Sequence, residues 1–249
     1  MLPQLENLAR IAAVLTGAHA DESPPAPIGP ASTFPIFGAL RREKFVFAGA
    51  SILPLLLDDD FDRPLRRTDD TDVVVSVLHY GEWQRLRDAL VAAGFRERAD
   101  DRHARQILFW FDGLPVDFIP ARMAEFGTAN RWLSLGFDLA ETAELETGQS
   151  IWRLSASAWL AAKIAAFEQR GRRDVLMSRD LEDIVTLLIG RRSLAEEIRY
   201  SQGEIRAYII EAFRAWLRDN LVLDAMDGSV SSAADRHRLD AIRNEIAEL

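Results

Sequence analysis

Residues 66–78, RRTDDTDVVVSVL, lead from a charged loop into a run of β-branched residues. The three valines at 73–75 are typical of a central strand, which we expect over residues 70–78. Side chains alternate along a strand, so Asp70 and Asp72 at its start point to the same face. The stretch therefore predicts two neighbouring carboxylates at the end of a buried strand. The other interpretation of an Asp-x-Asp pair is a turn or a helix cap.

A second apolar strand, followed by a turn of small residues, precedes the acidic one. Residues 45–48, FVFA, read as a buried strand that Gly49 ends, and residues 50–57 have the pattern of a helix leaving the turn. Backbone N–H groups at such a helix start face an anion. Gly49, Ala50 and Ser51 are therefore candidates for a phosphate-binding turn, although Gly-x-Ser also occurs in ordinary turns.

A third acidic side chain lies in a predicted β-hairpin. The pair Asp112-Gly113 separates two apolar runs, at 106–111 and 115–119, and Asp-Gly in this setting is a strong hairpin signal. The hairpin places Asp117 on its second strand, among apolar residues. An unpaired carboxylate is costly to bury, so Asp117 needs a cation or a hydrogen-bonding partner.

These three carboxylates are candidate metal ligands. Mg²⁺ is usually bound by one or two carboxylates together with substrate phosphates, and a third carboxylate allows a two-metal site. Asp70, Asp72 and Asp117 are therefore predicted to hold Mg²⁺ or Mn²⁺. The alternative partner of Asp117 is an arginine, Arg105 or Arg122.

Helical periodicity dominates the rest of the chain. Apolar residues recur at helix spacing over 2–16 and 80–93, while proline-rich residues 21–35 predict a surface linker that leads to a short helix near 37–42. After residue 121 the helical pattern is found in four segments, at 155–170, 179–188, 203–217 and 233–247.

The sequence thus predicts an α/β (α+β) fold with a mixed sheet flanked by helices and a C-terminal helical bundle. We expect a catalytic domain with its N-terminal helix over residues 1–150 and a helical domain over residues 151–249. The chain length of 249 residues suits either one elaborated domain or two small ones.

Composition excludes several classes of function. A net charge of -9 argues against a protein that binds nucleic acid through overall positive charge, although a local basic patch is compatible with it. The chain has no cysteine, which excludes disulfides, thiolate zinc sites and cysteine nucleophiles, and its four histidines lack metal-ligand spacing. No run approaches the about 20 apolar residues of a membrane helix. We expect a soluble, cytoplasmic protein without membrane contact.

The order of these motifs resembles the nucleotidyltransferase superfamily, and within it the AbiEii-type toxins of abortive-infection and toxin–antitoxin systems. The resemblance covers roughly residues 44–190. Residues 66–72 resemble the family's Arg-x-Ser/Thr-x-Asp-x-Asp stretch, and Asp117 matches its third strand carboxylate. Two features depart from the family: Ala50 stands where a second glycine is common, and the loop from 51 to 70 is long for a nucleotidyltransferase.

Two later segments extend the resemblance. LAAKIAAF at 160–167 resembles the helix that brings a lysine to the active site, and RDLEDI at 179–184 resembles the family's Arg-Asp-x-x-Asp helix. The resemblance implies that Lys163 contacts the triphosphate and that Asp180 contributes to nucleotide binding. A lysine on an amphipathic helix is otherwise usually solvated, and Asp180 and Asp183 also suit a helix start without any catalytic role.

The resemblance implies transfer of a nucleoside monophosphate from an NTP to an acceptor hydroxyl, with release of pyrophosphate. The implied acceptor is the 3′ end of a tRNA, and an antitoxin is the implied protein partner. A local cluster of arginines is a candidate RNA contact, consisting of Arg170, Arg172, Arg173 and Arg179.

Three alternatives stay open. The acceptor can be a small molecule or a protein hydroxyl, which the acidic net charge favours. The fold can be a degenerate module that binds a nucleotide without catalysis. A phosphatase of the haloacid-dehalogenase type also uses Asp-x-Asp after a strand. There the first Asp is a nucleophile and the motif usually opens the chain's first core strand, whereas here a Gly-x-Ser strand precedes the motif.

Overall fold

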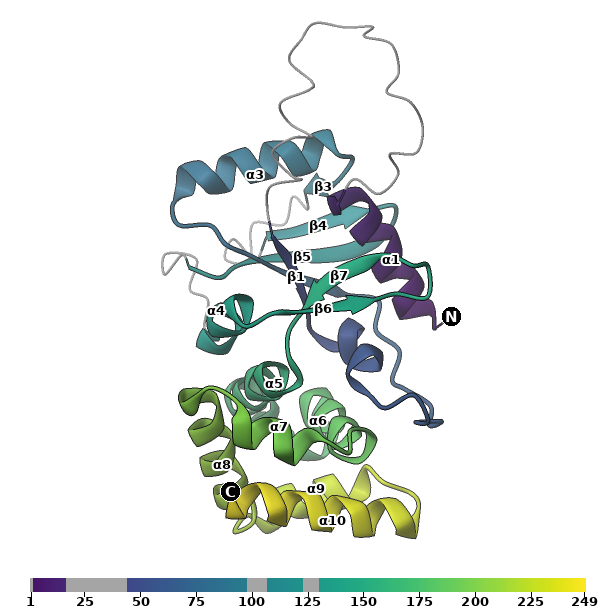
Figure 1. The fold of residues 1–249 in the computed structure, drawn as a ribbon, viewed down its shortest axis with the longest axis vertical. Helices are drawn as coiled ribbons and strands as arrows, with labels where there is room; N and C mark the ends of the chain where they lie inside the picture. Colours follow the sequence, from purple (N-terminus) through teal and green to yellow (C-terminus); the bar gives the residue numbers. More distant parts are fainter. Residues whose placement is uncertain (1, 17–43, 98–106, 123–129) are drawn as a thin grey trace, which may run out of the picture. The chain divides into compact units, whose positions relative to one another are not determined.

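A computed structural model describes residues 2–16, 44–97, 107–122 and 130–249 (Figure 1). The predicted linker at 21–35 and the short helix near 37–42 lie outside these ranges, as does Arg105. The described residues form a mixed sheet with flanking helices and a set of C-terminal helices, which confirms the predicted α+β class. In the described ranges, no helix combines the length and apolar character needed to cross a membrane.

The sheet has seven strands in the order β3-β4-β5-β2-β1-β7-β6. The strand β2 lies at its centre, antiparallel to β1 and parallel to β5, while β1 is also parallel to β7. The strands are β1 Phe45–Ala48, β2 Thr71–Val75, β3 Arg96–Glu97, β4 Ile107–Phe111, β5 Leu114–Pro120, β6 Glu141–Glu144 and β7 Ser150–Arg153. The valine run is a central strand, as the sequence predicts.

The predicted Asp-Gly hairpin joins β4 to β5. Asp112 and Gly113 have φ angles of 49° and 80°, and a type I′ turn requires positive φ at both central residues. Phe111 pairs with Leu114 directly across the turn, and the register continues to Leu108 opposite Asp117. The turn thereby fixes the register that places Asp117.

Apolar side chains fill the space around the sheet. Val73, Phe109 and Phe118 are fully buried, and the rings of Phe109 and Phe118 meet edge to face at a centroid distance of 5.5 Å. Helices α1 (Pro3–Thr16) and α3 (Tyr80–Ala92) lie beside the sheet in Figure 1 and bury one apolar face each. Both match the helices that the sequence predicts at 2–16 and 80–93.

The segment after β1 is a helix, as the sequence predicts for residues 50–57. Ala50–Leu56 is a helix of the 3₁₀ type with Pro54 inside it. Proline has no backbone N–H and its ring clashes with the preceding turn of an α-helix, so the tighter and shorter 3₁₀ form is favoured.

The second half of the chain is helical. All four helices predicted there are present, and three shorter ones, α4, α7 and α9, were not predicted. The helices are α4 Arg131–Asp138, α5 Ala156–Arg170, α6 Arg179–Gly190, α7 Leu194–Tyr200, α8 Gly203–Trp216, α9 Asn220–Gly228 and α10 Ala233–Glu248. Their buried faces carry Trp159, Ile184, Phe213 and Leu239.

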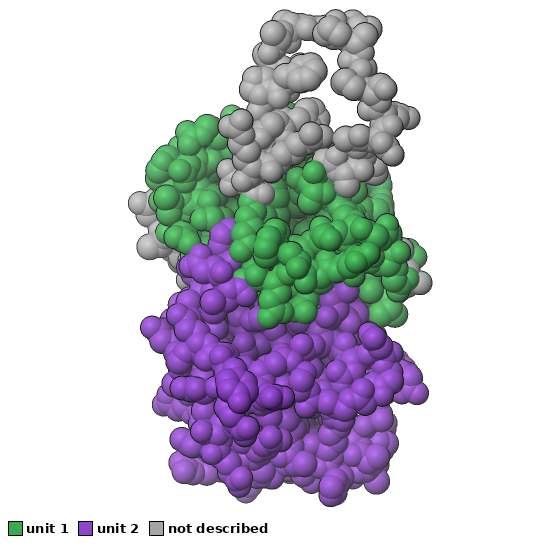
Figure 2. Space-filling view, in the orientation of Figure 1, with its two compact units in different colours: residues 1–52, 67–129, 140–154 green, residues 53–66, 130–139, 155–249 purple. Residues whose placement is uncertain are grey.

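The chain divides into two compact units, each made of three separate segments (Figure 2). Unit 1 comprises residues 1–52, 67–129 and 140–154, and unit 2 comprises residues 53–66, 130–139 and 155–249. In unit 2 the Asp58 N–H donates to the Gly190 carbonyl at 2.8 Å, and Asn130 Nδ2 donates to the Ala162 carbonyl at 2.8 Å. Two segments from the first 150 residues therefore belong to the helical unit, in place of a single boundary near residue 150.

Candidate functional site

Two carboxylates of unit 1 lie side by side on neighbouring parallel strands. Asp72 of β2 is in direct register with Asp117 of β5. Paired residues on adjacent strands point to the same face, and the strands run about 4.8 Å apart. Both side chains are partly buried, between strand neighbours such as Val73 and Phe118 that are fully buried. The structure thus brings together two of the three carboxylates singled out in the sequence.

The pair is electrostatically unfavourable when both groups are ionised. Burial raises the pKa of Asp117 to about 7, and the negative charges of Asp72 and Asp70 act in the same direction. Asp117 forms no hydrogen bond or ion pair with another residue in the described ranges. Such a carboxylate takes up a proton or a cation near neutral pH, and a strongly perturbed pKa of this origin is typical of functional sites.

Gly49 is required next to this pair. Its φ angle is 66°, in the left-handed region, and a Cβ built on it would overlap the Asp72 carboxylate, with Asp72 Cγ only 2.7 Å away. Ala48 pairs with Asp72 across β1 and β2, which brings the turn after β1 to the carboxylate. Any side chain at position 49 would push Asp72 away from its place beside Asp117.

Replacing Gly49 with alanine should lower the free energy of unfolding by about 2–4 kcal/mol, because backbone strain and overlap with Asp72 add. Gly113→Ala is the matched control: Gly113 also has a positive φ of 80°, but a Cβ there meets nothing within 4 Å. The control should lose only about 1–2 kcal/mol. Urea denaturation measures both, and equal losses would contradict the close approach of Asp72 to Gly49.

The other residues of the predicted phosphate turn lie at the start of the 3₁₀ helix. Ser51 is 1% exposed, and its Oγ donates to the Ala48 carbonyl at 3.2 Å. The hydroxyl therefore closes the turn locally. Ala50 is partly buried. The Ser51 hydroxyl proton is therefore not among the donors that this turn can offer to a phosphate.

Asp70 lies outside the strand pair, although its charge acts on Asp117. It is exposed and precedes β2, which begins at Thr71, so strand alternation does not fix its side chain. Throughout the part of the chain that the structure describes, no three or more His, Cys, Asp or Glu side chains are grouped as metal ligands. Of the three predicted metal ligands, the structure thus places two, Asp72 and Asp117, side by side.

A second group of charged residues is buried in unit 2. Lys163 of α5 is 9% exposed, and its Nζ donates to Asp183 Oδ2 at 2.7 Å and to Asp180 Oδ1 at 3.1 Å. Both acids lie on α6, whose N-cap is Ser178. The lysine that the resemblance assigns to the triphosphate is therefore tied to the two acids of the Arg-Asp-x-x-Asp helix.

Two arginines complete this buried ion cluster, which we define as Arg66, Lys163, Arg170, Asp180 and Asp183. Arg170 donates to Asp180 from Nε at 2.7 Å and from Nη2 at 3.0 Å, and Arg66 donates to Asp183 from Nε at 3.2 Å and from Nη2 at 3.0 Å. Burial opposes ionisation of Asp180, but hydrogen bonds from Arg170 and the charge of Lys163 outweigh it and lower its pKa. Three cations surround two carboxylates.

The predicted RNA-contacting arginines separate into two kinds. Arg170 belongs to the buried ion cluster, and Arg172 pairs with Glu168 at 2.9 Å and Asp219 at 2.5 Å. Arg173 and Arg179 are exposed. Half of the predicted cluster therefore stabilises the helical unit by pairing with its own carboxylates.

Comparisons with known proteins give little guidance. No protein-family model matches the chain, and no curated protein matches it. Among solved structures, the crystal structure of JHP933 from Helicobacter pylori is similar with a TM-score of 0.41 and 12% identity, over 100% of this chain and 94% of that one. Likeness at this level leaves function to be argued from the chain's own residues.

Proposed function

We propose that this protein is a metal-dependent nucleotidyltransferase that moves a nucleoside monophosphate from an NTP to an acceptor hydroxyl. One observation carries the proposal: Asp72 and Asp117 lie in register on parallel strands, beside a turn that only glycine can form at position 49. This arrangement concentrates negative charge at a place that a backbone turn also approaches. It agrees with the resemblance to AbiEii-type toxins drawn from the sequence motifs.

The chemistry of the pair fits a divalent cation. Two ionised carboxylates on adjacent strands repel one another, and the raised pKa of Asp117 reports that repulsion together with burial. Mg²⁺ commonly takes one or two carboxylates and completes its shell with water and phosphate oxygens. Asp72 and Asp117 would hold Mg²⁺ or Mn²⁺, with exposed Asp70 as a further ligand. When bound, the metal neutralises phosphate charge and lowers the pKa of the acceptor hydroxyl.

The chain's own residues supply the other roles. As a carboxylate at this site, Asp117 would also accept the proton of the acceptor hydroxyl. The backbone of Gly49, Ala50 and Ser51 would face the phosphates. Lys163 belongs to unit 2, where its Nζ donates to Asp180 and Asp183; its contact with the triphosphate is what the resemblance implies.

The acceptor and the partner follow from the resemblance alone. A tRNA 3′ end as acceptor, an antitoxin as protein partner and a cytoplasmic location belong to this proposal. The net charge of -9 favours the second candidate, a nucleotidyltransferase that modifies a protein or a small molecule.

Incubation of the purified protein with Mg²⁺, each α-labelled NTP in turn, and total RNA or total protein tests the proposal. We expect label on RNA, and we expect Asp72→Asn to reduce its rate of incorporation by about 10²–10⁴-fold, because the isosteric amide cannot hold the metal. Asp69→Asn is the matched control, since Asp69 is exposed and pairs with Arg67 at 3.2 Å; its rate should equal that of the wild type.

The other outcomes separate the candidates. Label on protein would show that the acceptor is a protein, as in the second candidate function. Release of pyrophosphate without a macromolecular label would indicate a small-molecule acceptor. If no NTP is consumed under any condition, or if Asp72→Asn is as active as the wild type, the proposed function is wrong.

A further inference from the structure

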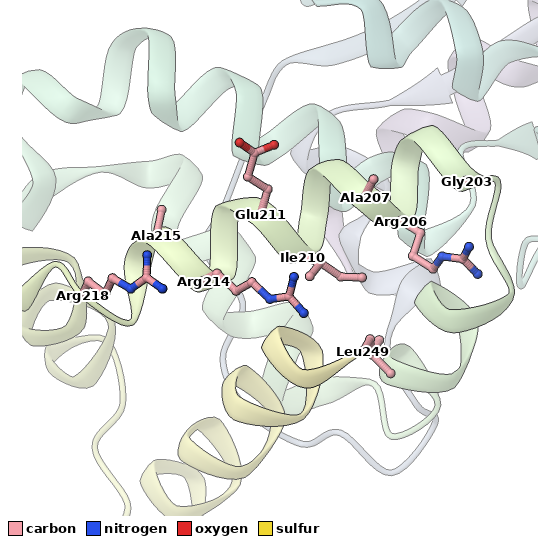
Figure 3. Close-up of a pocket in the computed structure, with 9 residues that line it drawn as sticks. All are labelled: Gly203, Arg206, Ala207, Ile210, Glu211, Arg214, Ala215, Arg218 and Leu249. Atoms are coloured by element: carbon pink, nitrogen blue, oxygen red, sulfur yellow. The ribbon is translucent and has the colours of Figure 1, made fainter.

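An open groove of about 660 Å³ lies along helix α8 in unit 2. Figure 3 shows Arg206 and Arg214 on α8, Arg218 just past the end of that helix, and Leu249 just after the end of α10 on the other side. The side chains that line the groove include three arginines and one acid, Glu211, so the net charge of these side chains is +2. The whole chain has a net charge of -9, so the charge of the groove is opposite in sign to that of the whole chain.

The three groove arginines are not neutralised by acids. Arg206 Nη1 donates to the Arg199 carbonyl at 2.8 Å, and Arg214 Nε donates to the Ala247 carbonyl at 2.7 Å. Within the described ranges, none of the three lies in ion-pair distance of a carboxylate. Because a guanidinium has five N–H donors, each retains several for an external anion.

The spacing of these arginines suits a polymer. Arg206 and Arg214 are about 12 Å apart along the axis of α8 at 1.5 Å per residue, and Arg218 follows the end of the helix. At a rise of about 3.4 Å per nucleotide, 12 Å corresponds to about four nucleotides of one strand. Between the arginines the groove is lined by Ala207 and Ile210, which are uncharged and leave the guanidinium groups accessible. A small anion would contact only one of these positions at a time.

We propose that this groove binds the phosphate backbone of RNA, and the inference rests on the proposed function, in which RNA is the acceptor. Guanidinium groups match phosphate oxygens in a bidentate geometry. Glu211 also lines the groove, but Figure 3 shows its carboxylate on the other side of α8 from Arg206 and Arg214. The groove replaces Arg170 and Arg172 as the RNA contact, because those two are paired with acids.

Binding of fluorescently labelled tRNA without NTP, measured by anisotropy over a range of salt, tests this inference. Arg206→Glu/Arg218→Glu should weaken binding by about tenfold or more at about 0.1 M salt and reduce the slope of log Kd against log salt by about 1.4. Arg214 is left unchanged because it supports the end of α10.

Two double variants with the same change of charge are the controls. Arg85→Glu/Arg96→Glu alters exposed arginines of unit 1 and should bind RNA as the wild type does. Arg173→Glu/Arg179→Glu alters the exposed half of the predicted cluster. If that variant loses affinity while Arg206→Glu/Arg218→Glu keeps it, the groove is not the RNA site. Competition by polyglutamate equal to that by RNA would assign the groove to an acidic protein instead and overturn the inference.

The test separates the groove from the proposed function. Asp69→Asn, at an exposed acid outside both the groove and the carboxylate pair, should bind RNA with wild-type affinity. RNA binding that depends on Arg206 and Arg218, without any label transfer to RNA, would support the groove and contradict RNA as the acceptor. Label transfer to RNA that is as efficient in Arg206→Glu/Arg218→Glu as in the wild type would support the function and refute the groove.

Discussion

The Asp183→Asn variant is expected to lose about 3–5 kcal/mol of the free energy of unfolding, as measured by urea denaturation. Asp183 is 2% exposed and accepts hydrogen bonds from Arg66 and Lys163. Asparagine has nearly the same shape, so the substitution removes charge and little volume. Asp180 would then be the one carboxylate left in the buried ion cluster to balance three cations.

Lys163→Met is the informative comparison for this variant. Without the lysine, the cluster consists of two pairs, Arg66 with Asp183 and Arg170 with Asp180, and its charges balance. The methionine fills the space of the lysine stem. We therefore expect Lys163→Met to cost only about 1–2 kcal/mol, and Lys163→Met/Asp183→Asn to lose less than the sum of the single changes.

These variants also separate the two roles open to Lys163. If the lysine contacts the triphosphate, Lys163→Met should raise KM for the NTP under conditions where the protein is fully folded. If it acts only inside the cluster, kinetics of the folded protein should be unchanged. A loss of stability in Lys163→Met as large as in Asp183→Asn would contradict the balance of charges proposed for the cluster.

Much of the fold was predictable because it is encoded locally. The valine run at 73–75 marks the central strand, and the Asp112-Gly113 turn marks the β4–β5 hairpin. The strands β6 and β7 were not predicted, since they are short and, as in Glu141–Glu144, largely exposed and polar. Their place in the sheet is decided by pairing with β1, which no local pattern reveals.

The sequence also did not predict that each unit is built from several separate segments of the chain. Residues 53–66 were interpreted as a helix and a charged loop of the first domain. In the structure, Arg191 donates to the Leu56 carbonyl at 2.7 Å and Arg192 pairs with Asp60 at 2.8 Å. These partners are more than 130 residues apart in the chain. The local sequence of a charged loop does not indicate which distant residue it binds.

The candidate site was predictable in part. Asp72 and Asp117 stood out because each is an acid at or in an apolar strand, which is a local feature. Their exact register depends on the parallel pairing of β2 with β5. The partnership of Arg66 with Asp183 spans 117 residues, so the sequence shows both residues as parts of motifs without showing that they bind each other.

The Asp117→Asn variant is expected to be more stable than the wild type near pH 8 when divalent cations are absent, by about 2–4 kcal/mol. The folded-state pKa of Asp117 is raised from 3.8 to about 7. Between these two values the unfolded chain has lost the proton that the folded protein keeps. The stability of the wild type therefore falls as pH rises through this window, and the cost is complete above pH 7. The amide of the variant does not titrate, so its free energy of unfolding does not fall with pH for this reason.

Divalent cations should reverse the order of the two proteins. Mg²⁺ held by Asp72 and Asp117 stabilises the wild type near pH 8 by mass action, whereas Asp117→Asn should gain much less and should also lose nucleotide transfer. Asp69→Asn, at an exposed acid outside the pair, should follow the wild type at every pH with and without Mg²⁺. Thermal melts over pH 4–8, with and without Mg²⁺, measure all of these differences. The opposite result would be an Asp117→Asn variant that is less stable than the wild type at pH 8 without metal. It would mean that a cationic side chain, such as Arg105 or Arg122, already neutralises Asp117 and that the pair is not a metal site.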